Sequence, residues 1–372
     1  MKLVFTPCEN ALMALVRLHL HTADVLSLPD DTFALTDDEW AEVYALACSQ
    51  GVKAIVCDAV KSLPKDCQPP TSLMQKWTLD KRCIVIENNL RKEVLADLCR
   101  LCHSNGLQPV LLKGFTLARY YPQPDFRESG DFDLWFPDHE AESDALFATM
   151  VEGLNYDNAK HTTFSYYGVD VENHQTLLDH GKPYTHINDA IEEQLRAYWR
   201  EEPPVTFPLP GDESVLMPAT LFTILMIARH QTAHLSYKFV LRHIVDWGLI
   251  IEQSDRGDVQ AVLGQIDDPQ FNSSLRIVTL LAQTALGLGE GVMDGYTASE
   301  RRRARRLLIY IFRPLSLQGY RRGTLRYYPK ALQCLWRTSW FSNLGTGENR
   351  LHFMLPFFLN KLFKFRKCED KT

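Results

Sequence analysis

The chain has 372 residues, of which 45% are hydrophobic and 23% are charged, and its formal net charge is −6 at pH 7. This composition excludes a disordered or fibrous chain, and the length is sufficient for two or three domains with a sizeable core. Glu9 and Arg17 interrupt the first apolar run and every 18-residue segment contains a charge, so we expect neither a signal peptide nor a transmembrane helix. The nine cysteines are scattered, and Cys99 and Cys102 form one C-x-x-C without a second pair, which is typical of core thiols in the cytoplasm.

The first 106 residues predict helices. Apolar spacing predicts helices over residues 10–20 and 52–63, and a capping box of Thr36 and Glu39 begins another helix that ends at Gly51. Thr71 follows two prolines and is expected to cap a long periodic segment that reaches His103. No catalytic pattern is visible in these helices, so we expect a helical layer that packs on the next domain.

A short apolar run from Val110 to Leu112 predicts a buried strand, which stops at Lys113 and Gly114. A helical turn follows, and Pro122 ends it. A glycine at the end of a strand lets a phosphate chain approach the backbone, and the helix that begins there offers free N–H groups and the positive end of its dipole. The pattern therefore indicates a phosphate site, with Lys113 as a neutralising charge.

The next strand is predicted from Asp131 to Phe136. Residues two apart in a strand point to the same face, so Asp131 and Asp133 project together while the apolar residues between them face a core. Two adjacent carboxylates repel one another and need a cation between them, and hard oxygen ligands suit Mg²⁺ or Mn²⁺. Lysine, glycine, helix start and D-x-D strand together predict a site for a metal ion and a nucleoside triphosphate.

Beyond a helix predicted over residues 139–152, residues 161–167 and 169–174 predict two more strands. In the second of these, Asp170, Glu172 and His174 share one face. That face could complete a metal site, but a solvated edge strand has the same pattern, so both interpretations stay open.

These motifs carry a resemblance. The LKG at residues 112–114, followed by R-x-x-G-D-F-D-L at residues 127–134, resembles the polymerase beta-like nucleotidyltransferase fold, in which a strand ending in Gly-Ser is followed by a helix and a D-x-D strand. More narrowly, the chain is similar to a bacterial family of uncharacterised nucleotidyltransferases, and the VENH at residues 171–174 matches that family's (D/E)-x-H pattern. The resemblance covers about residues 107–251.

Two features depart from the general pattern. Phe115 stands where the fold has its serine, so the hydroxyl that would hold a phosphate is missing, and Lys113 or Arg127 would take its role. Sixteen residues separate Gly114 from Asp131, which is more than in compact members.

The resemblance implies Mg²⁺-dependent (or Mn²⁺-dependent) transfer of a nucleoside monophosphate from an NTP, with ATP as the default donor, to an unidentified hydroxyl acceptor. It implies that Asp131, Asp133 and Glu172 are catalytic and bind two metal ions, with Glu172 as general base and Asp170 as its competitor. Residues expected to contact the nucleotide are Lys113, Gly114, Arg127, His174, His230 and Arg242. Arg127 could equally pair with a surface carboxylate.

Residues 183–218 are rich in proline and predict an irregular boundary with one helix near residues 190–200. Two helices follow, over residues 221–234 and from about residue 238. Helical spacing and apolar content then continue to Phe312.

The first of these two helices carries His230 and His234 at i, i+4, a spacing that could ligate zinc, but Gln231 replaces the glutamate of H-E-x-x-H and argues against a zinc protease. The second carries Arg242 and Asp246, one turn apart, which can form an ion pair. We expect the histidines and Arg242 either to line the nucleotide or acceptor pocket or to pack between helices.

Charge is concentrated near the C-terminus. Residues 301–372 contain 17 Lys and Arg against 3 Asp and Glu, a net charge of +14, which leaves −20 for the first 300 residues. Residues 351–367, LHFMLPFFLNKLFKFRK, interleave aromatic and basic side chains. Three partners for this tail stay open: the acidic N-terminal helices, an anionic membrane surface and nucleic acid.

Together these patterns predict an α/β (α+β) fold. A nucleotidyltransferase core with a small mixed sheet (residues 107–210) lies between an N-terminal helical region (1–106) and a C-terminal helical region with the basic tail (211–372). The protein is expected in the cytoplasm, or at the inner face of the membrane if the tail binds lipid. Two other functions stay open: a non-catalytic binding or scaffold protein, which Phe115 would permit, and a metal-dependent phosphohydrolase that uses the same carboxylates.

Overall fold

The computed structural model describes residues 4–313 except 30, 152, 157–159, 181–184 and 236–238, together with Pro329. The chain opens with four helices: α1 (Pro7–His19), α2 (Asp37–Ser49), α3 (Lys53–Lys61) and α4 (Thr71–Ser104). Short 3₁₀ turns at Val25–Ser27 and Lys65–Cys67 connect them. The predicted basic tail, residues 351–367, lies outside the described residues.

Capping explains where these helices begin. The predicted box of Thr36 and Glu39 is confirmed at the start of α2, and a second box of Thr6 and Glu9 begins α1 three residues earlier than apolar spacing predicted. The prediction for Thr71 was wrong, because Pro70 is the N-cap residue of α4 and no side chain caps it. A proline before the first turn fixes an extended backbone there, so the helix starts without a side-chain cap.

The central part of the chain forms one mixed sheet of six strands, in the order β3-β4-β2-β1-β6-β5. Its elements are β1 (Val110–Leu111), α5 (Phe115–Ala118), a 3₁₀ turn (Pro124–Phe126), β2 (Phe132–Trp135), α6 (Glu140–Met150), β3 (His161–Tyr166), β4 (Val169–His174), α7 (Thr185–Glu201), β5 (Val205–Pro208) and β6 (Ser214–Met217). The β2–β4 and β1–β6 pairs are parallel, and the other pairs are antiparallel. The predicted mixed sheet is therefore confirmed.

The prediction of an irregular stretch after α7 was wrong. Residues 205–208 and 214–217 form a hairpin, and β6 pairs with β1. The prolines hid it, because β5 is an edge strand and Pro208 stands at its end, where the sheet needs no further N–H donor. The sheet thus extends to Met217, past the predicted boundary at residue 210, and the division into domains stays a prediction.

The two faces of the sheet belong to different cores. Phe132, Leu134 and Phe136 pack with the second half of α4 and with Phe147 of α6, as the alternation in β2 predicted. The buried thiols of Cys99 and Cys102 are part of this core. On the opposite face, Trp135 joins the larger core that the N-terminal and C-terminal helices share.

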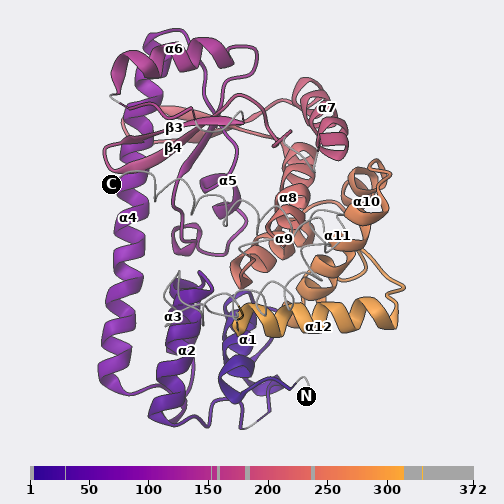
Figure 1. Ribbon diagram of the computed structural model, residues 1–372. Helices are drawn as coiled ribbons and strands as arrows, with labels where there is room; N and C mark the ends of the chain where they lie inside the picture. Colours follow the sequence, from indigo (N-terminus) through magenta and orange to yellow (C-terminus); the bar gives the residue numbers. More distant parts are fainter. Residues whose placement is uncertain are drawn as a thin grey trace.

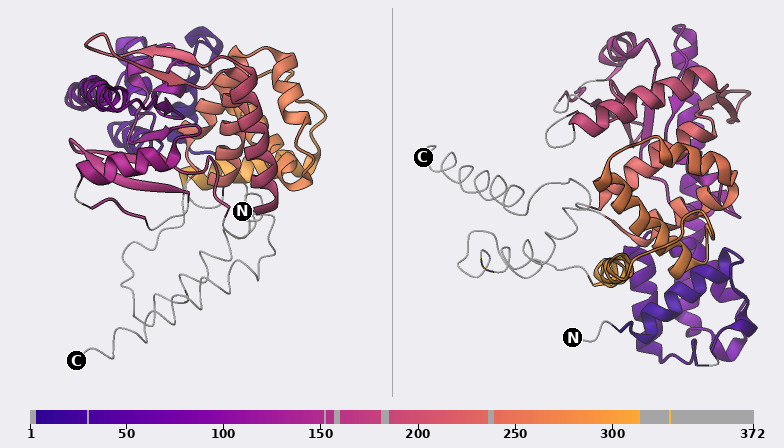
Figure 2. Two further views of the ribbon diagram at one scale, coloured as in Figure 1. Left: turned by 90° about the horizontal axis from the view of Figure 1, so that it is seen from above. Right: turned by 90° about the vertical axis from the view of Figure 1, so that its right-hand side faces the viewer.

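The C-terminal helices are α8 (Thr220–His234), α9 (Leu241–Gln253), α10 (Arg256–Gly264), α11 (Pro269–Leu281), which runs into a π-helical turn (Ala282–Leu286), and α12 (Ala298–Phe312). In Figure 1, α4 runs along one side of the molecule from the N-terminal helices to the sheet. The right panel of Figure 2 shows the N-terminal helices at one end, the sheet at the other, and the C-terminal helices between them. Among the described residues, no helix combines the length and the apolar character that crossing a bilayer requires.

Candidate functional site

Asp131, Asp133 and Glu172 lie on the face of the sheet opposite Phe132 and Phe136. We call this group of side chains the carboxylate face, or carboxylate site. In the parallel pair of β2 and β4, Asp133 lies directly beside Glu172. Asp131 precedes β2 and has the same parity as Asp133, so both side chains project to this face. The Leu112 N–H donates to the Asp133 carbonyl oxygen at 2.9 Å, which fixes the end of β1 against the D-x-D strand.

Asp133 is the buried centre of the site, with 1% of its surface exposed. Its Oδ1 lies 2.5 Å from Lys113 Nζ and 3.1 Å from His174 Nε2. Burial alone would raise the pKa of Asp133, but Lys113 and the hydrogen bond from His174 outweigh it and hold the pKa well below the usual range. Burial would likewise lower the pKa of Lys113, but the Asp133 carboxylate raises it above the ordinary lysine value. Asp133 and Lys113 therefore form an ion pair at neutral pH.

Glu172 is half-buried and lies between two imidazoles. Its Oε2 is 3.7 Å from His174 Nε2 and 3.8 Å from His161 Nδ1. The contact with His174 lowers the pKa of Glu172, so this carboxyl is ionised at neutral pH. His161 lies opposite His174 in the β3–β4 pair. Burial lowers the pKa of His161. His174 is fully buried, and its Nδ1 faces the Thr176 carbonyl oxygen at 3.3 Å, so contacts on both sides hold the ring.

Negative charge exceeds positive charge at this face. Asp131 is exposed at its edge, and partial desolvation followed by repulsion from Asp133 raises the pKa of Asp131. Lys160 is also close, and its pKa falls to about 8, mainly through burial and then through repulsion from Lys113. Three carboxylates therefore face two lysines, Lys113 and a Lys160 that is still mostly protonated at pH 7, so the face is an oxygen-donor set with room for additional positive charge.

The turn after β1 has the geometry that its glycine predicts. Gly114 has φ 72° and ψ −109°, a conformation that residues with a Cβ avoid. The neighbouring Thr116 hydroxyl donates to the Leu111 carbonyl oxygen at 2.7 Å. Phe115, at the position of the expected serine, packs in the core and stacks on Phe207 with ring centroids 6.2 Å apart. Neither side chain is placed to replace the missing serine hydroxyl, which leaves the two cations beside this turn, Lys113 and Arg127, as candidates for its role.

Arg127, in the loop before β2, binds the buried carboxylate of Asp246 in α9. Its Nε and Nη2 donate to the two oxygens of Asp246 in α9 at 2.8 and 3.0 Å, and Tyr121 Oη donates to Asp246 Oδ1 at 2.7 Å. Nη1 of the same guanidinium donates to the Gly114 carbonyl oxygen at 3.2 Å. Burial alone would raise the pKa of Asp246, but Arg127 outweighs it and lowers that pKa. We call Tyr121, Arg127 and Asp246 the Arg127 cluster; it ties α9 to the glycine turn, and the predicted contact of Arg127 with a nucleotide stays a prediction.

Arg242, another residue predicted to contact the nucleotide, is close enough to this cluster for its charge to lower the pKa of Asp246, but it has other hydrogen-bond partners. Its Nη1 donates to the Glu128 carbonyl oxygen at 2.7 Å, and its side chain packs against Gly51. The partners that the structure gives to Asp246 are Arg127 and Tyr121, where sequence spacing suggested Arg242. Arg242 thus joins α9 to the N-terminal helices and to the loop before the D-x-D strand.

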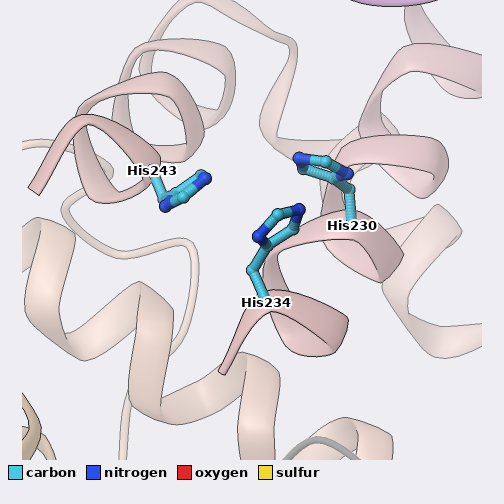
Figure 3. Close-up of side chains that lie close together, drawn as sticks. All are labelled: His230, His234 and His243. Carbon is cyan, nitrogen blue, oxygen red and sulfur yellow. The ribbon is translucent and has the colours of Figure 1, made fainter. Parts of the chain in front are cut away.

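His230 and His234 face a third histidine, His243 of α9 (Figure 3). The ring centroids of His230 and His234 are 4.2 Å apart, and those of His234 and His243 are 4.7 Å apart. Burial lowers the pKa of His230 well below its usual range, and the next contributions come from Lys113, His234 and His243. The charges of Lys113 and Asp133 both act on His230, so this histidine cluster is close to the carboxylate site.

Among the described residues, two groups of three side chains have potential metal-ligand atoms all within 4.8 Å of one another. They are His161, Glu172 and His174, and His230, His234 and His243. The predicted ligands Asp131, Asp133 and Glu172 are not such a group, and their metal-binding role stays a prediction.

Sequence reasoning missed three residues of this region: Lys160, His161 and His243. A signal existed for His161, because counting back from the two-residue turn at Tyr167 and Gly168 places it opposite His174. His243 had no such signal, since its neighbours belong to a different helix.

The family model described as "Uncharacterised nucleotidyltransferase" matches residues 36–287 of the chain. That range contains the sheet, the carboxylate face, the Arg127 cluster and the three histidines. No curated protein and no solved structure matches the chain.

Proposed function

Because the chain belongs to the uncharacterised nucleotidyltransferase family, we propose that it transfers a nucleoside monophosphate from an NTP, with ATP as the default donor, to a hydroxyl acceptor. The observation that carries this proposal is the pairing of Asp133 with Glu172 on adjacent parallel strands, beside the Gly114 turn. It brings a D-x-D motif, a further carboxylate and a glycine turn to one face of the sheet.

The residues of this face fit a hard divalent cation. Asp131, Asp133 and Glu172 supply only oxygen ligands, and their charge exceeds that of Lys113. These three side chains would hold Mg²⁺ or Mn²⁺. When bound, the ion would neutralise charge on the phosphates of the nucleotide.

In the proposed reaction, the acceptor oxygen attacks the α-phosphorus, the bond from that phosphorus to the bridging oxygen of the β-phosphate breaks, and pyrophosphate leaves. Glu172, ionised and half-buried, would take the proton of the acceptor hydroxyl. Lys113 would neutralise the triphosphate as a point charge. Arg127 would act as a positioning residue, because it holds the Gly114 carbonyl oxygen and so the turn that the phosphates approach.

The test follows the α-phosphate of labelled ATP. Wild-type protein with Mg²⁺ is expected to release pyrophosphate and to transfer the label to an acceptor fraction from a small-molecule and macromolecular extract. Glu172→Gln should abolish both, whereas Asp170→Asn, which changes an exposed carboxylate on the same strand, should leave both unchanged. Release of labelled nucleoside monophosphate or diphosphate without a labelled acceptor would favour the phosphohydrolase. Turnover of no NTP would favour the scaffold.

A further inference from the structure

We propose that His230, His234 and His243 form a second metal site, which binds a first-row transition ion such as Zn²⁺ and is distinct from the carboxylate site for Mg²⁺. This inference does not rest on nucleotidyl transfer. It rests on the convergence of three imidazoles from two helices, a group that contains no carboxylate among the residues the structure describes.

The backbone brings the three rings together. His230 and His234 are one turn apart on the last part of α8, so they point the same way, and α9 returns against α8 with His243 in its first turn. One nitrogen of each ring lies within 4.8 Å of a nitrogen of the other two. Around a tetrahedral zinc ion with Zn–N bonds of about 2.0–2.1 Å, the nitrogens stand roughly 3.3 Å apart. Side-chain rotations that move the nitrogens by on the order of 1 Å would therefore close the site.

The chemistry of the ligands selects the ion. Imidazole nitrogen suits Zn²⁺, Cu²⁺, Ni²⁺ and Fe²⁺, whereas Mg²⁺ requires oxygen ligands. Burial favours the neutral ring at His243, whose pKa falls to about 3, so its lone pair is not blocked by a proton at neutral pH. Three histidines leave a fourth position for water or for an oxygen of a ligand, as in zinc sites that keep an open position.

Metal binding costs His243 one hydrogen bond. Its Nδ1 accepts a hydrogen bond from the Val240 N–H at 3.0 Å, and its ring stacks on Phe239 with centroids 5.4 Å apart. The proton of the neutral ring is therefore on Nε2. Coordination through Nε2 moves that proton to Nδ1 and gives up one backbone hydrogen bond, while the stacking with Phe239 can remain.

The test is competition for Zn²⁺ against a chromogenic chelator, with the full chain at neutral pH. Wild type is expected to bind one Zn²⁺ tightly. Loss of a residue that only supports a ligand lowers metal affinity by about 10–100-fold, so His230→Asn and His234→Asn should each lower it by more than about 100-fold. Excess Mg²⁺ should not displace the ion.

Two controls separate this site from other binding. His139→Asn removes a histidine whose side chain is 56% exposed, and it should bind Zn²⁺ as the wild type does. Glu172→Gln disrupts the other group of potential ligands, His161, Glu172 and His174, and should also retain the tight Zn²⁺. Loss of Zn²⁺ in Glu172→Gln with retention in His234→Asn would overturn the proposal.

A measurement on wild type alone guards against variants that fail to fold. X-ray absorption of the Zn²⁺-loaded protein is expected to show three imidazole ligands and one oxygen. One or two imidazoles, or no Zn²⁺ uptake at all, would contradict the proposal. Because nucleotide turnover is not part of these measurements, failure here leaves the proposed transfer reaction standing, and failure of the labelling assay leaves the zinc site standing.

Discussion

The carboxylate face and the Arg127 cluster are both polar, lie close to the Gly114 turn and differ in one respect. In the Arg127 cluster, one guanidinium meets one carboxylate through two hydrogen bonds, and Tyr121 Oη adds a third. At the carboxylate face, Lys113 is shared among Asp131, Asp133 and Glu172. The Arg127 cluster is paired within the chain and stabilises it, whereas the carboxylate face has an excess of negative charge, and we propose that a cation from outside binds there. Charge balance, rather than burial, is thus the feature that distinguishes these two groups of polar side chains.

The largest expected effect is on the Arg127 cluster. Asp246→Ala leaves a buried guanidinium and the Tyr121 hydroxyl without their acceptor, and should lower the free energy of unfolding by about 3–5 kcal/mol. Urea denaturation measures this loss. As a control, Glu87→Ala breaks an exposed i, i+4 pair with Arg91 and should cost less than about 1 kcal/mol. Similar losses in the two variants would contradict the structural role of the cluster.

Lys113 and Arg127 are expected to respond differently to Mg²⁺ when each is replaced by methionine. Lys113→Met removes the positive charge beside Asp133, and should lower the free energy of unfolding in EDTA by about 1–3 kcal/mol because charge repulsion is left uncompensated. Millimolar Mg²⁺ should restore much of that loss. Arg127→Met should lose stability that Mg²⁺ does not restore, because Asp246, with 2% of its surface exposed, lies where a hydrated Mg²⁺ has no access.

Equal rescue of both variants, or of neither, would remove the distinction between the two regions. Thermal unfolding with and without Mg²⁺ is sufficient to decide.

A smaller effect is expected at the turn that both regions share. Gly114→Ala forces a side chain into a positive-φ conformation, which should cost about 1–2 kcal/mol. The added Cβ would meet only the Asp131 carbonyl oxygen, at 3.7 Å, so strain rather than collision causes the loss. Gly106→Ala is the matched control, because Gly106 also has a positive φ of 73° but lies away from the site at the end of α4. Gly114→Ala should lose at least as much stability as Gly106→Ala, because its ψ of −109° lies outside the left-handed helical region, and only Gly114→Ala should also weaken nucleotide binding.

The smallest effect, expected at Asp131, is a gain in stability rather than a loss. The pKa of Asp131 is raised in the folded state, so its ionised form opposes folding, and Asp131→Asn should raise the free energy of unfolding at pH 7 by less than about 1 kcal/mol. This gain should disappear as the pH falls below the ordinary aspartate pKa of about 4, where the wild-type carboxyl is protonated in both states. Chemical denaturation at pH 7 and at low pH measures it. A destabilised Asp131→Asn protein at pH 7 would contradict the excess of negative charge.

The sequence predicted the part of the site that depends on local spacing. The i, i+2 pattern placed Asp131 and Asp133 on one face and the phenylalanines of β2 on the other, and the structure has that arrangement. The position of Glu172 beside Asp133 came from the family resemblance, and the register confirms that the two are adjacent.

The parts that sequence reasoning missed depend on contacts between distant segments. Arg127 and Asp246 are 119 positions apart in the sequence. Asp246 accepts two hydrogen bonds from the Arg127 guanidinium, although Arg242 is nearer to it in the sequence. His243 meets His230 and His234 only because α9 packs against α8. The hairpin of β5 and β6 was hidden because prolines at an edge strand look like a loop.

We propose that the carboxylate face binds a nucleotide together with a divalent cation. Thermal unfolding with each NTP, with and without Mg²⁺, tests it most directly, using wild type and an Asp131→Asn/Glu172→Gln double variant that keeps the buried pair of Asp133 and Lys113. At a concentration 100 times its dissociation constant, a ligand of the folded state raises the free energy of unfolding by about 2.7 kcal/mol. We predict such a rise in wild type with one NTP only when Mg²⁺ is present, and its loss in the double variant. A rise of equal size without Mg²⁺ or in the double variant, or no rise with any NTP, would contradict the claim.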